Sequence, residues 1–292
     1  MIITNLLGGL GNQMFQYAAG RALSLRNNTT HCLDVSDFGS YGLHQGFELH
    51  RVFSMPITLA SEEDIQSILG WQSSRSVRRI LLRLNWTLLR RQGFIVEPHF
   101  NYWPELFNAP RESYLLGYWQ SEKYFKDYSA MIRSDFTFRH QLEAVNKELA
   151  EVIGLSNAVS VHIRRGDYAN NLKTKATHGL CSLDYYHAAI KYVSERVAPP
   201  HFFVFSDDIA WAQENLKFNF PCQFIGHNQG ASSYIDMQLM SLCKHHIIAN
   251  SSFSWWGAWL NLNADKIVIA PKRWFVNKSD VRDLLPQEWV TL

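Results

Sequence analysis

The sequence predicts an α/β protein made of two lobes, and three observations support this fold class. The chain opens with a strand, a glycine loop, a helix and a second strand, and from residue 158 onward strands and helices alternate regularly. Of its 292 residues 47% are apolar, which is ample for a buried core in each of two lobes. Alternating strands and helices are typical of a parallel sheet that is covered by helices on both faces.

The first elements are the clearest part of the N-terminal half. Residues 1–7 are predicted to form a strand, residues 8–13 a glycine loop and residues 14–27 a helix, and a second strand is predicted at residues 31–35. This order is the start of a βαβ unit. The stretch from residue 61 to 153 is less regular, and no sheet can be traced through it. Helices are predicted there at residues 61–69, 75–91, 121–132 and 139–153.

The C-terminal half predicts a doubly wound parallel sheet. Strands are expected at residues 158–163, 201–205, 222–225, 245–249 and 266–269, and helices at residues 182–197, 208–216, 232–243 and 253–261. The segment between the helix at 139–153 and the strand at 158–163 is the predicted boundary. It divides the chain into lobes of residues 1–155 and 156–292.

Composition excludes several classes of protein. The formal net charge is only +2, from 28 basic and 26 acidic residues, so no overall field attracts nucleic acid. The four cysteines are far apart and form no C-x-x-C pair, which favours a reducing compartment. The N-terminal apolar run is too short for a signal peptide or a membrane span. We therefore expect a cytoplasmic protein, with the inner face of a bacterial membrane as an alternative location.

Residues 75–91 form a basic, leucine-rich stretch. Its arginines are Arg75, Arg78, Arg79, Arg83, Arg90 and Arg91. We interpret it as an ordinary surface helix with solvated arginines, and peripheral contact with an anionic membrane is the alternative.

The motif "VHIRRGDY" places two arginines at the end of a predicted strand. Arg164 and Arg165 directly follow the alternating residues of the strand, and Gly166 allows a tight turn before Asp167. Ligands collect at strand ends in α/β proteins, and two guanidinium groups there suit a dianionic group such as a diphosphate. A surface ion pair with Asp167 is the alternative.

The glycine loop "GGLGNQ" opens the first helix. Gly11 occupies a position where backbone amides can approach an anion or a sugar, but the loop matches neither a dinucleotide fingerprint nor a P-loop. Asn12 and Gln13 are either amide donors toward a ligand or caps of the helix, and the loop alone favours capping.

The motif "FSDD" follows the predicted strand at residues 201–205. Ser206 and Asp207 are natural N-caps, and we expect the acids here to cap the next helix and to orient a nearby arginine. The chain has no D-x-D sequence, and its twelve histidines form no familiar ligand set. The sequence therefore requires no metal.

The last motif, "IIANSSFSWWGAW", joins a strand to a helix, and the preceding helix carries Asp236. Asn250, Ser251 and Ser252 precede the helix, where hydroxyl groups and amides together suit phosphate or ribose oxygens. The tryptophans at helical spacing are interpreted mainly as packing residues.

Together, "GGLGNQMFQYA", "VHIRRGDY", "FSDD" and "IIANSSFSWWGAW" resemble the bacterial α-1,2-fucosyltransferases of glycosyltransferase family 11. The resemblance implies a GT-B-like fold, with two Rossmann-like lobes and a cleft between them. It implies GDP-β-L-fucose as the donor, inversion at the fucose anomeric carbon, and no cofactor or metal. The implied acceptor is a galactose-terminated oligosaccharide or a lipid-linked glycan, for example in O-antigen biosynthesis. In this picture residues 1–155 are the acceptor-side lobe and residues 156–292 bind GDP-fucose.

The resemblance also assigns roles to single residues. His162 and Asp236 resemble the pair that lies near the guanine in related fucosyltransferases, Arg164 resembles the arginine on the β-phosphate, and Asn12 resembles the asparagine that faces the fucose. The loop that cradles the diphosphate is matched by Ser251, Ser252 and Phe253. The predicted catalytic residues are Arg164, Asn12 and Asp167, and the predicted donor-binding residues are Gly11, Asn12, His162, Arg164, Arg165, Ser206, Asp236, Asn250, Ser251, Ser252 and Phe253.

One departure from those relatives concerns the general base. Some of them carry a glutamate shortly after the arginine motif, whereas "DYANNLKTK" offers no carboxylate beyond Asp167. Two other classes of protein are also considered. An adhesion protein would use the tripeptide at residues 165–167, and a non-catalytic sugar- or nucleotide-binding module would use the 14% aromatic content.

Overall fold

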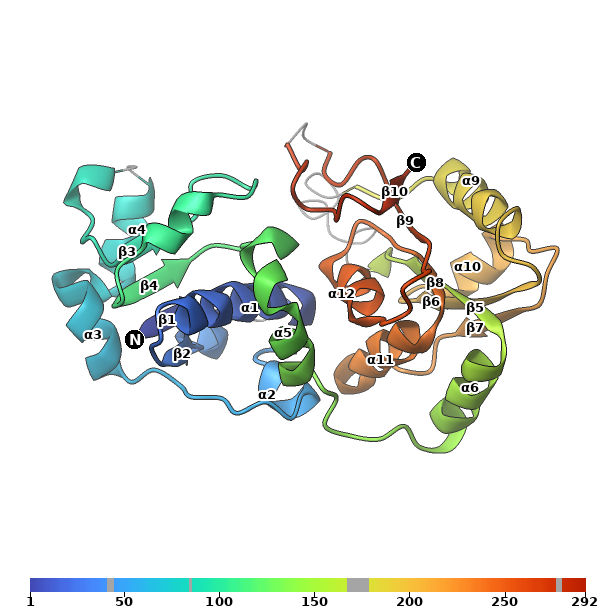
Figure 1. The fold of residues 1–292 in the computed structure, drawn as a ribbon, viewed down its shortest axis with the longest axis horizontal. Helices are drawn as coiled ribbons and strands as arrows, with labels where there is room; N and C mark the ends of the chain where they lie inside the picture. The colour runs from blue at the N-terminus through green and yellow to red at the C-terminus, as the bar shows by residue number, and fades with distance from the viewer. Residues whose placement is uncertain (41–44, 84–85, 167–178, 277–279) are drawn as a thin grey trace. The chain divides into compact units, whose positions relative to one another are not determined.

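The computed structural model describes residues 1–40, 45–83, 86–166, 179–276 and 280–292 (Figure 1). The contacts divide the chain into two compact units, each with its own parallel sheet and helices. Unit 1 comprises Met1–Arg139 and Val281–Leu284, and unit 2 comprises His140–Asp280 and Leu285–Leu292. The predicted α/β fold class is confirmed.

Unit 1 contains a four-stranded sheet in the order β2-β1-β4-β3, with every described pairing parallel. Its strands are β1 (Ile2–Asn5), β2 (His31–Asp34), β3 (Phe94–Val96) and β4 (Ser113–Leu116). Helix α1 (Leu10–Arg26) joins β1 to β2 and completes the predicted βαβ start. The predictions from sequence missed β3 and β4, which are only three and four residues long.

The remaining helices of unit 1 are α2 (Leu49–Val52), α3 (Glu62–Leu69), α4 (Arg75–Arg83) and α5 (Ser129–Asp135). A capping box begins α3, because the side chain of Ser61 accepts from the backbone of Asp64 and the Asp64 carboxylate accepts in return. The helix predicted at residues 75–91 ends at Arg83, and a 3₁₀ turn follows at Thr87–Leu89. The helix predicted at residues 121–132 begins as two 3₁₀ turns, and α5 starts only at Ser129.

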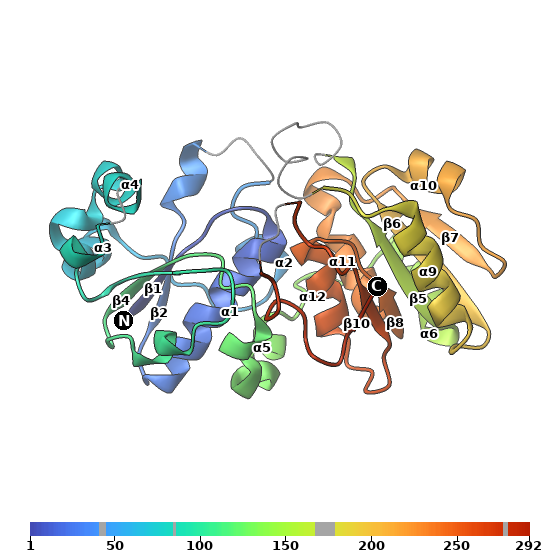
Figure 2. The same ribbon diagram turned by 90° about the horizontal axis from the view of Figure 1, so that it is seen from above.

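Unit 2 contains a six-stranded parallel sheet in the order β10-β9-β8-β5-β6-β7, so the predicted doubly wound sheet is confirmed. The strands are β5 (Asn157–Ile163), β6 (Pro200–Ser206), β7 (Cys222–Ile225), β8 (His245–Ile247), β9 (Val268–Ala270) and β10 (Val290–Thr291). The helices are α6 (Ala144–Leu155), α9 (Leu183–Ser194), α10 (Ile209–Asn215), α11 (Tyr234–Leu242) and α12 (Ser252–Leu260). Figure 2 shows α11 and α12 side by side, as in Figure 1.

The central strand β5 determines which residues face which helices. Val159, Val161 and Ile163 belong to one buried cluster with residues of α9 and α10. Because side chains alternate along a strand, His162 points to the opposite face, where its ring contacts Phe253 of α12. Trp255 of α12 is fully buried, as are its neighbours in that helix, which confirms that the tryptophans pack in the core.

The strand register sets the position of the carboxyl ends of β5, β6 and β8. Ile163 is opposite Ser206, and Val161 is opposite Ile247. These parallel strands therefore end at one edge of the sheet, which we call the carboxyl edge of unit 2. It carries the segments that follow Ile163, Ser206 and Ile247.

The observed division between the units falls at Arg139 and His140, ahead of the boundary predicted near residue 155. Helix α6 groups with unit 2 because it packs against β5 and α11. No helix among the described residues is long and apolar enough to cross a membrane.

Candidate active site

Two arginine–aspartate pairs occupy the carboxyl edge of unit 2, after β5 and β6. Arg164 Nη1 lies 3.1 Å from Asp207 Oδ2, and Arg165 Nε lies 3.2 Å from Asp208 Oδ2. Asp207 also accepts a 2.8 Å hydrogen bond from the backbone N–H of Arg165 through Oδ1. The prediction that these acids orient an arginine is therefore confirmed, and one carboxylate holds both arginines in place.

The same pairs are still open to solvent. The side chains of Arg164 and Asp207 are 27% and 26% exposed, so an incoming anion can reach the guanidinium group. The guanidinium carbon of Arg165 lies 3.9 Å from the centre of the Trp211 ring. This stacking restricts the movement of the Arg165 side chain. A Cβ atom on Gly166 would lie only 2.8 Å from Asp207 Oδ2, so this close approach needs glycine.

The capping prediction for "FSDD" was wrong in one respect. The N-cap of α10 is Asp208, whose Oδ1 accepts from the backbone N–H of Trp211 at 3.3 Å. The hydroxyl of Ser206 instead accepts from the backbone N–H of Asp208 at 3.0 Å. Ser206 therefore stabilises the turn that precedes α10. Asp167, the other carboxylate predicted near these arginines, lies outside the described residues.

The segment after β8 leads to the N-terminus of α12. Ser251 is the N-cap, and its hydroxyl accepts from the backbone N–H of Phe253 at 3.3 Å. Ser252 and Phe253 form the first turn and are partly exposed. The buried Asn250 makes side-chain contacts inside the protein, donating to the carbonyl of Trp274 at 3.1 Å and accepting from the Cys181 thiol at 3.4 Å. The described contacts of Asn250 thus support the loop.

His162 connects these two segments. It lies two residues before Arg164, and the centre of its ring is 5.7 Å from that of Phe253. Burial lowers the pKa of His162 to about 4, with the charge of Asp207 opposing and that of Arg164 adding to this effect. The imidazole is neutral at pH 7, and its Nδ1 has no hydrogen-bond partner within the described part of the chain. A buried nitrogen without a partner is available to a ligand.

Asp236 belongs to a buried polar cluster that the sequence did not predict. Asn228 Nδ2 donates to Asp236 Oδ1 at 2.8 Å, and Asn228 and Asn146 exchange hydrogen bonds of 3.0 Å. His227 Nε2 lies 2.9 Å from Asn146 Oδ1. Burial raises the pKa of Asp236 to about 7, and the hydrogen bond from Asn228 opposes this rise. No sequence motif links Asn146 to residues more than eighty positions away, so only the fold brings them together.

The glycine loop lies in unit 1, whereas the other predicted site residues within the described ranges lie in unit 2. Gly9 is the N-cap of α1, so the interpretation of Asn12 or Gln13 as a cap was wrong. Asn12 Oδ1 accepts from Gln120 Nε2 at 2.8 Å, and Gly11 is buried in the first turn.

Two features explain the shape of this loop. Gly8 has a φ of +80°, and a Cβ atom there would lie 2.6 Å from Asn12 Nδ2, so glycine lets the Asn12 amide lie over the loop. Gln13 donates to the carbonyls of Gly8 and Gly46 at 2.9 and 2.8 Å and accepts from the backbone N–H of Glu48. Gln13 is therefore a structural tie between two loops.

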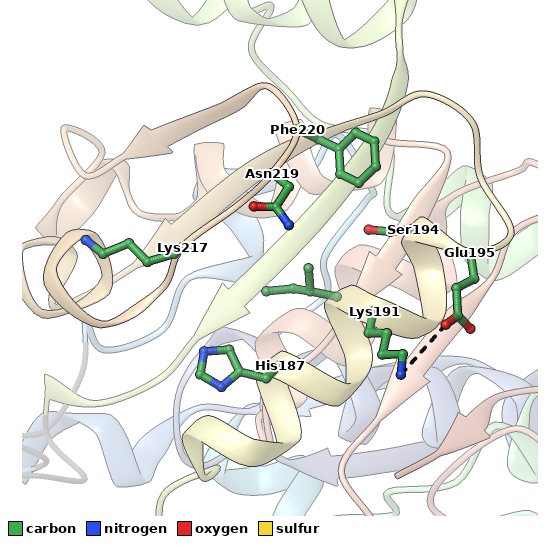
Figure 3. Close-up of a pocket in the computed structure, with 8 residues that line it drawn as sticks. His187, Lys191, Ser194, Glu195, Lys217, Asn219 and Phe220 are labelled. Atoms are coloured by element: carbon green, nitrogen blue, oxygen red, sulfur yellow. Dashed lines mark ion pairs between the residues drawn. The ribbon is translucent and has the colours of Figure 1, made fainter.

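Two further observations concern other kinds of site. Within the described ranges, no group of three or more His, Cys, Asp or Glu side chains is placed to hold a metal ion. A surface cavity of about 380 Å³ is lined by α9 residues including His187 and Lys191, and by Lys217 and Phe220 (Figure 3). The segment with Lys217 and Phe220 directly precedes β7, so this cavity lies at the amino ends of the strands, away from Arg164. None of the predicted site residues lines it.

The chain is similar to known glycosyltransferases along its whole length. The family model described as Glycosyl transferase family 11 matches residues 100–292. The chain is 38% identical to an alpha-1,2-colitosyltransferase of Escherichia coli, covering 100% of this chain and 99% of the relative. It is 35% identical to the E. coli O-antigen biosynthesis glycosyltransferase WbnK, covering 98% and 99%. It is 27% identical to galactoside alpha-(1,2)-fucosyltransferase 1 of Saimiri boliviensis boliviensis, covering 87% and 63%.

Solved structures show the same fold at low sequence identity. The alpha-1,6-fucosyltransferase NodZ soaked with GDP-fucose has a TM-score of 0.54 at 16% identity, covering 89% of this chain and 91% of that one. Arabidopsis thaliana FUT1 in complex with GDP has a TM-score of 0.52 at 12% identity, covering 92% and 70%. The two-sheet α/β architecture is thus the GT-B fold of these fucosyltransferases. From the family model and the two full-length E. coli relatives, we conclude that this chain belongs to glycosyltransferase family 11.

Proposed function

We propose that this enzyme transfers L-fucose from GDP-β-L-fucose to the 2-hydroxyl of a terminal galactoside, with inversion at the anomeric carbon to give an α-1,2 linkage. The observation that carries the proposal is the paired arginine site at the carboxyl edge of unit 2, where Asp207 and Asp208 fix Arg164 and Arg165. Family membership and the names of the relatives support the reaction type.

The chemistry of transfer explains why arginines are needed. Breaking the bond from fucose C1 to GDP builds negative charge on the β-phosphate and oxocarbenium character on the sugar. A fixed donor at the phosphate therefore stabilises the transition state more than the ground state. A guanidinium group makes two directed, charge-assisted bonds to phosphate, and Arg164 is the arginine that we assign to this role. Arg165, stacked on Trp211, supports the same anion.

The hydroxyls and amides at the start of α12 are the second part of the diphosphate site. Ser251, Ser252 and Phe253 place backbone N–H groups at the positive end of a nine-residue helix. The contact between Phe253 and His162 keeps this turn beside the end of β5. We assign the diphosphate to this turn and to Arg164 together.

Asp236 and His162 are our candidates for guanine recognition. An ionised carboxylate can accept from both the N1 and N2 donors of guanine, which uracil and cytosine cannot match. The pKa of Asp236 is about 7, so below that pH the free carboxyl group is mostly protonated. Because guanine binds the ionised form, its binding at low pH releases a proton. Asn228, which donates to Asp236 Oδ1, leaves Oδ2 for such a contact.

The proton of the acceptor hydroxyl must also leave. Asp167 is the only carboxylate in residues 167–175, so it is the candidate base. If cleavage of the donor runs ahead of attack, the proton leaves late and a weak base suffices. Asn12, which the sequence resemblance places toward the fucose, is proposed as an amide donor to the sugar.

A second donor is favoured by one observation, the 38% identity to an alpha-1,2-colitosyltransferase. Colitose is fucose without its 3-hydroxyl, so both sugars fit the same diphosphate and guanine site. The acceptor, a galactose-terminated oligosaccharide or a lipid-linked glycan, is the same in both cases.

The test is incubation with GDP-fucose or GDP-colitose and a panel of galactosides, with the products analysed by mass spectrometry and linkage analysis. We expect a product that is heavier by one fucose residue and is substituted at O2 of galactose. A higher kcat/KM with GDP-colitose would replace the proposed donor. Absence of transfer from either donor, together with GDP binding, would favour a non-catalytic nucleotide-binding protein.

A further inference from the structure

A surface of unit 1 combines exposed apolar side chains with arginines. The exposed fractions are 60% for Trp71, 52% for Ile80, 48% for Trp86, 98% for Leu88 and 52% for Leu89. Large apolar side chains gathered in this way on one surface usually mark an interaction site. We call this set, together with the exposed Arg79, Arg83 and Arg91, the Trp–Arg surface.

The backbone brings the members of this surface together. Arg79, Ile80 and Arg83 lie on the exposed face of α4, while Arg78 and Leu81 point into the unit. The backbone N–H of Trp86 donates to the carbonyl of Leu81 at 3.1 Å, which holds the chain close to the end of α4.

The following segment is tied back to Trp71 by one buried side chain. Gln72 donates to the carbonyl of Leu89 at 2.6 Å and accepts from the backbone N–H of Arg91 at 3.1 Å. The Arg91 guanidinium lies over Gly70, where a Cβ atom would collide with it. Leu89 and Arg91 are therefore held next to Trp71.

The charge of this surface has one sign. From residue 65 to residue 96 the sequence contains six arginines and no aspartate or glutamate. Arg78 is buried against Asp34 and Arg75 pairs with Asp37, so these two are already compensated. The exposed arginines beside the tryptophans and leucines match a partner that is negatively charged at its surface and apolar just beneath it.

We propose that the Trp–Arg surface docks unit 1 onto an anionic lipid membrane. Tryptophan side chains prefer the headgroup level, leucines enter the boundary of the acyl chains, and arginines reach the lipid phosphates while their stems cover apolar surface. A nucleic acid would not use Leu88 and Leu89, and a purely apolar protein groove would not use the arginines. The inference is independent of the donor and of the reaction proposed above.

The test is co-sedimentation of the full chain with phosphatidylethanolamine vesicles that contain about one quarter phosphatidylglycerol. Each arginine near an anionic surface strengthens binding by about fivefold. The double variant Arg79→Glu and Arg83→Glu should therefore bind at least about 25-fold more weakly. Leu88→Ser should also weaken binding, and added salt should weaken the wild type because it screens the arginines.

Matched controls come from exposed residues of unit 2. Lys147→Glu with Lys217→Glu makes the same charge change, and Leu155→Ser removes a leucine that is 91% exposed. These controls should bind vesicles like the wild type, and melting curves should show that all variants fold. Equal binding to phosphatidylcholine vesicles, or equal loss in the controls, would overturn the proposal. A dimer that Leu88→Ser dissociates, without vesicle binding, would identify a second copy of the chain as the occupant instead.

Discussion

Two arginine–aspartate pairs, one in each unit, have similar chemistry but different surroundings. In unit 1, Arg78 Nη1 lies 3.7 Å from Asp34 Oδ2, and the two side chains are 9% and 2% exposed. In unit 2, Arg164 Nη1 lies 3.1 Å from Asp207 Oδ2, and the side chains are 27% and 26% exposed. Both aspartates lie at the carboxyl end of a parallel strand, Asp34 ending β2 and Asp207 following β6.

The partners of the two aspartates explain the difference. Asp34 also accepts from the hydroxyl of Tyr114 at 2.6 Å and from the backbone N–H of Ser36 at 2.9 Å. Burial alone would raise the pKa of Asp34, but these hydrogen bonds and the charge of Arg78 outweigh it and lower the pKa. Asp34 is thus held by three groups and is shielded from solvent together with Arg78. The pair at Arg164 is more open to solvent, and we therefore assign the donor diphosphate to it and not to the buried pair.

The largest effect on stability is expected at the buried pair. Arg78→Ala leaves Asp34 buried without its cation and removes the contact with the Tyr114 ring, 4.9 Å from the guanidinium carbon. Removing one partner of a buried ion pair costs about 3–5 kcal/mol. The free energy of unfolding, measured in urea, should fall by that amount. A loss below about 1 kcal/mol would show that this pair is as dispensable as a surface pair.

The largest effect on catalysis is expected at the open pair. Arg164→Ala should lower kcat on a soluble galactoside by roughly 100- to 1000-fold, because one preorganised transition-state donor is lost. Arg164→Lys should keep part of the activity, since lysine supplies the charge without the fork. The melting temperature should hardly change, because exposed pairs contribute only about 0–1 kcal/mol. A folded Arg164→Ala enzyme within about threefold of the wild-type kcat would remove Arg164 from the mechanism.

A smaller effect is expected at a third aspartate, Asp236, whose described hydrogen-bond partner is the neutral Asn228. The Asp236→Asn variant should bind GDP about tenfold more weakly, since one directed charge-assisted interaction with guanine is lost. Its affinity for UDP should change much less. An equal loss for both nucleotides would place Asp236 away from the base.

The pH dependence of GDP binding is a second readout of Asp236. The folded-state pKa is about 7, so the acceptor form is present above this pH and is lost as the pH falls through it. Wild-type affinity for GDP should therefore decrease from pH 8 to pH 6. The expected decrease is roughly tenfold, because the free Asp236 carboxylate takes up one proton that GDP binding must release. The Asp236→Asn variant should show a smaller decrease, because only the terminal phosphate of GDP, with a pKa of about 6, still takes up a proton in this range. Isothermal titration over this range measures both proteins, and a variant that keeps the full pH dependence would exclude Asp236 as the titrating group.

The smallest effect is expected from metal chelation. The sequence has no D-x-D motif, and in the proposed function the arginine pair supplies the positive charge at the diphosphate. Excess EDTA should leave the transfer rate unchanged. Loss of activity that only Mn²⁺ or Mg²⁺ restores would show that the arginines act together with a metal.

Sequence reasoning worked best where local pattern and tertiary structure agree. The β5 and β6 strands are long and rich in β-branched or aromatic residues, so the sheet of unit 2 and the positions of Arg164 and Asp207 after its strands could be predicted. Strands β3 and β10 have only three and two residues and were not predicted, and each pairs with a neighbouring strand. The equally short β8 and β9 could be predicted because they lie in the regular alternation of strands and helices.

The same limit applies to the site. Arg164, Asp207 and Ser251 follow strands or begin helices, so their place at the carboxyl edge could be inferred from strand order. The partner of Asp236, Asn228, lies only eight residues earlier, but Asn228 is in turn held by Asn146 of α6, 82 residues away, and no sequence motif predicts this contact. The N-cap of α10 is Asp208, whereas Ser206 and Asp207 were predicted. Asp207 instead contacts both arginines.

We propose that the open pair at Arg164 binds the donor diphosphate, and a comparison of GDP binding with guanosine binding is the sharpest test of this assignment. Both ligands carry the same base and ribose, so the ratio of their dissociation constants reports the diphosphate alone. Isothermal titration should show wild-type enzyme binding GDP far more tightly than guanosine. In Arg164→Ala this preference should shrink by at least about tenfold, while the affinity for guanosine stays the same. An unchanged ratio in a folded Arg164→Ala protein would show that the diphosphate binds elsewhere.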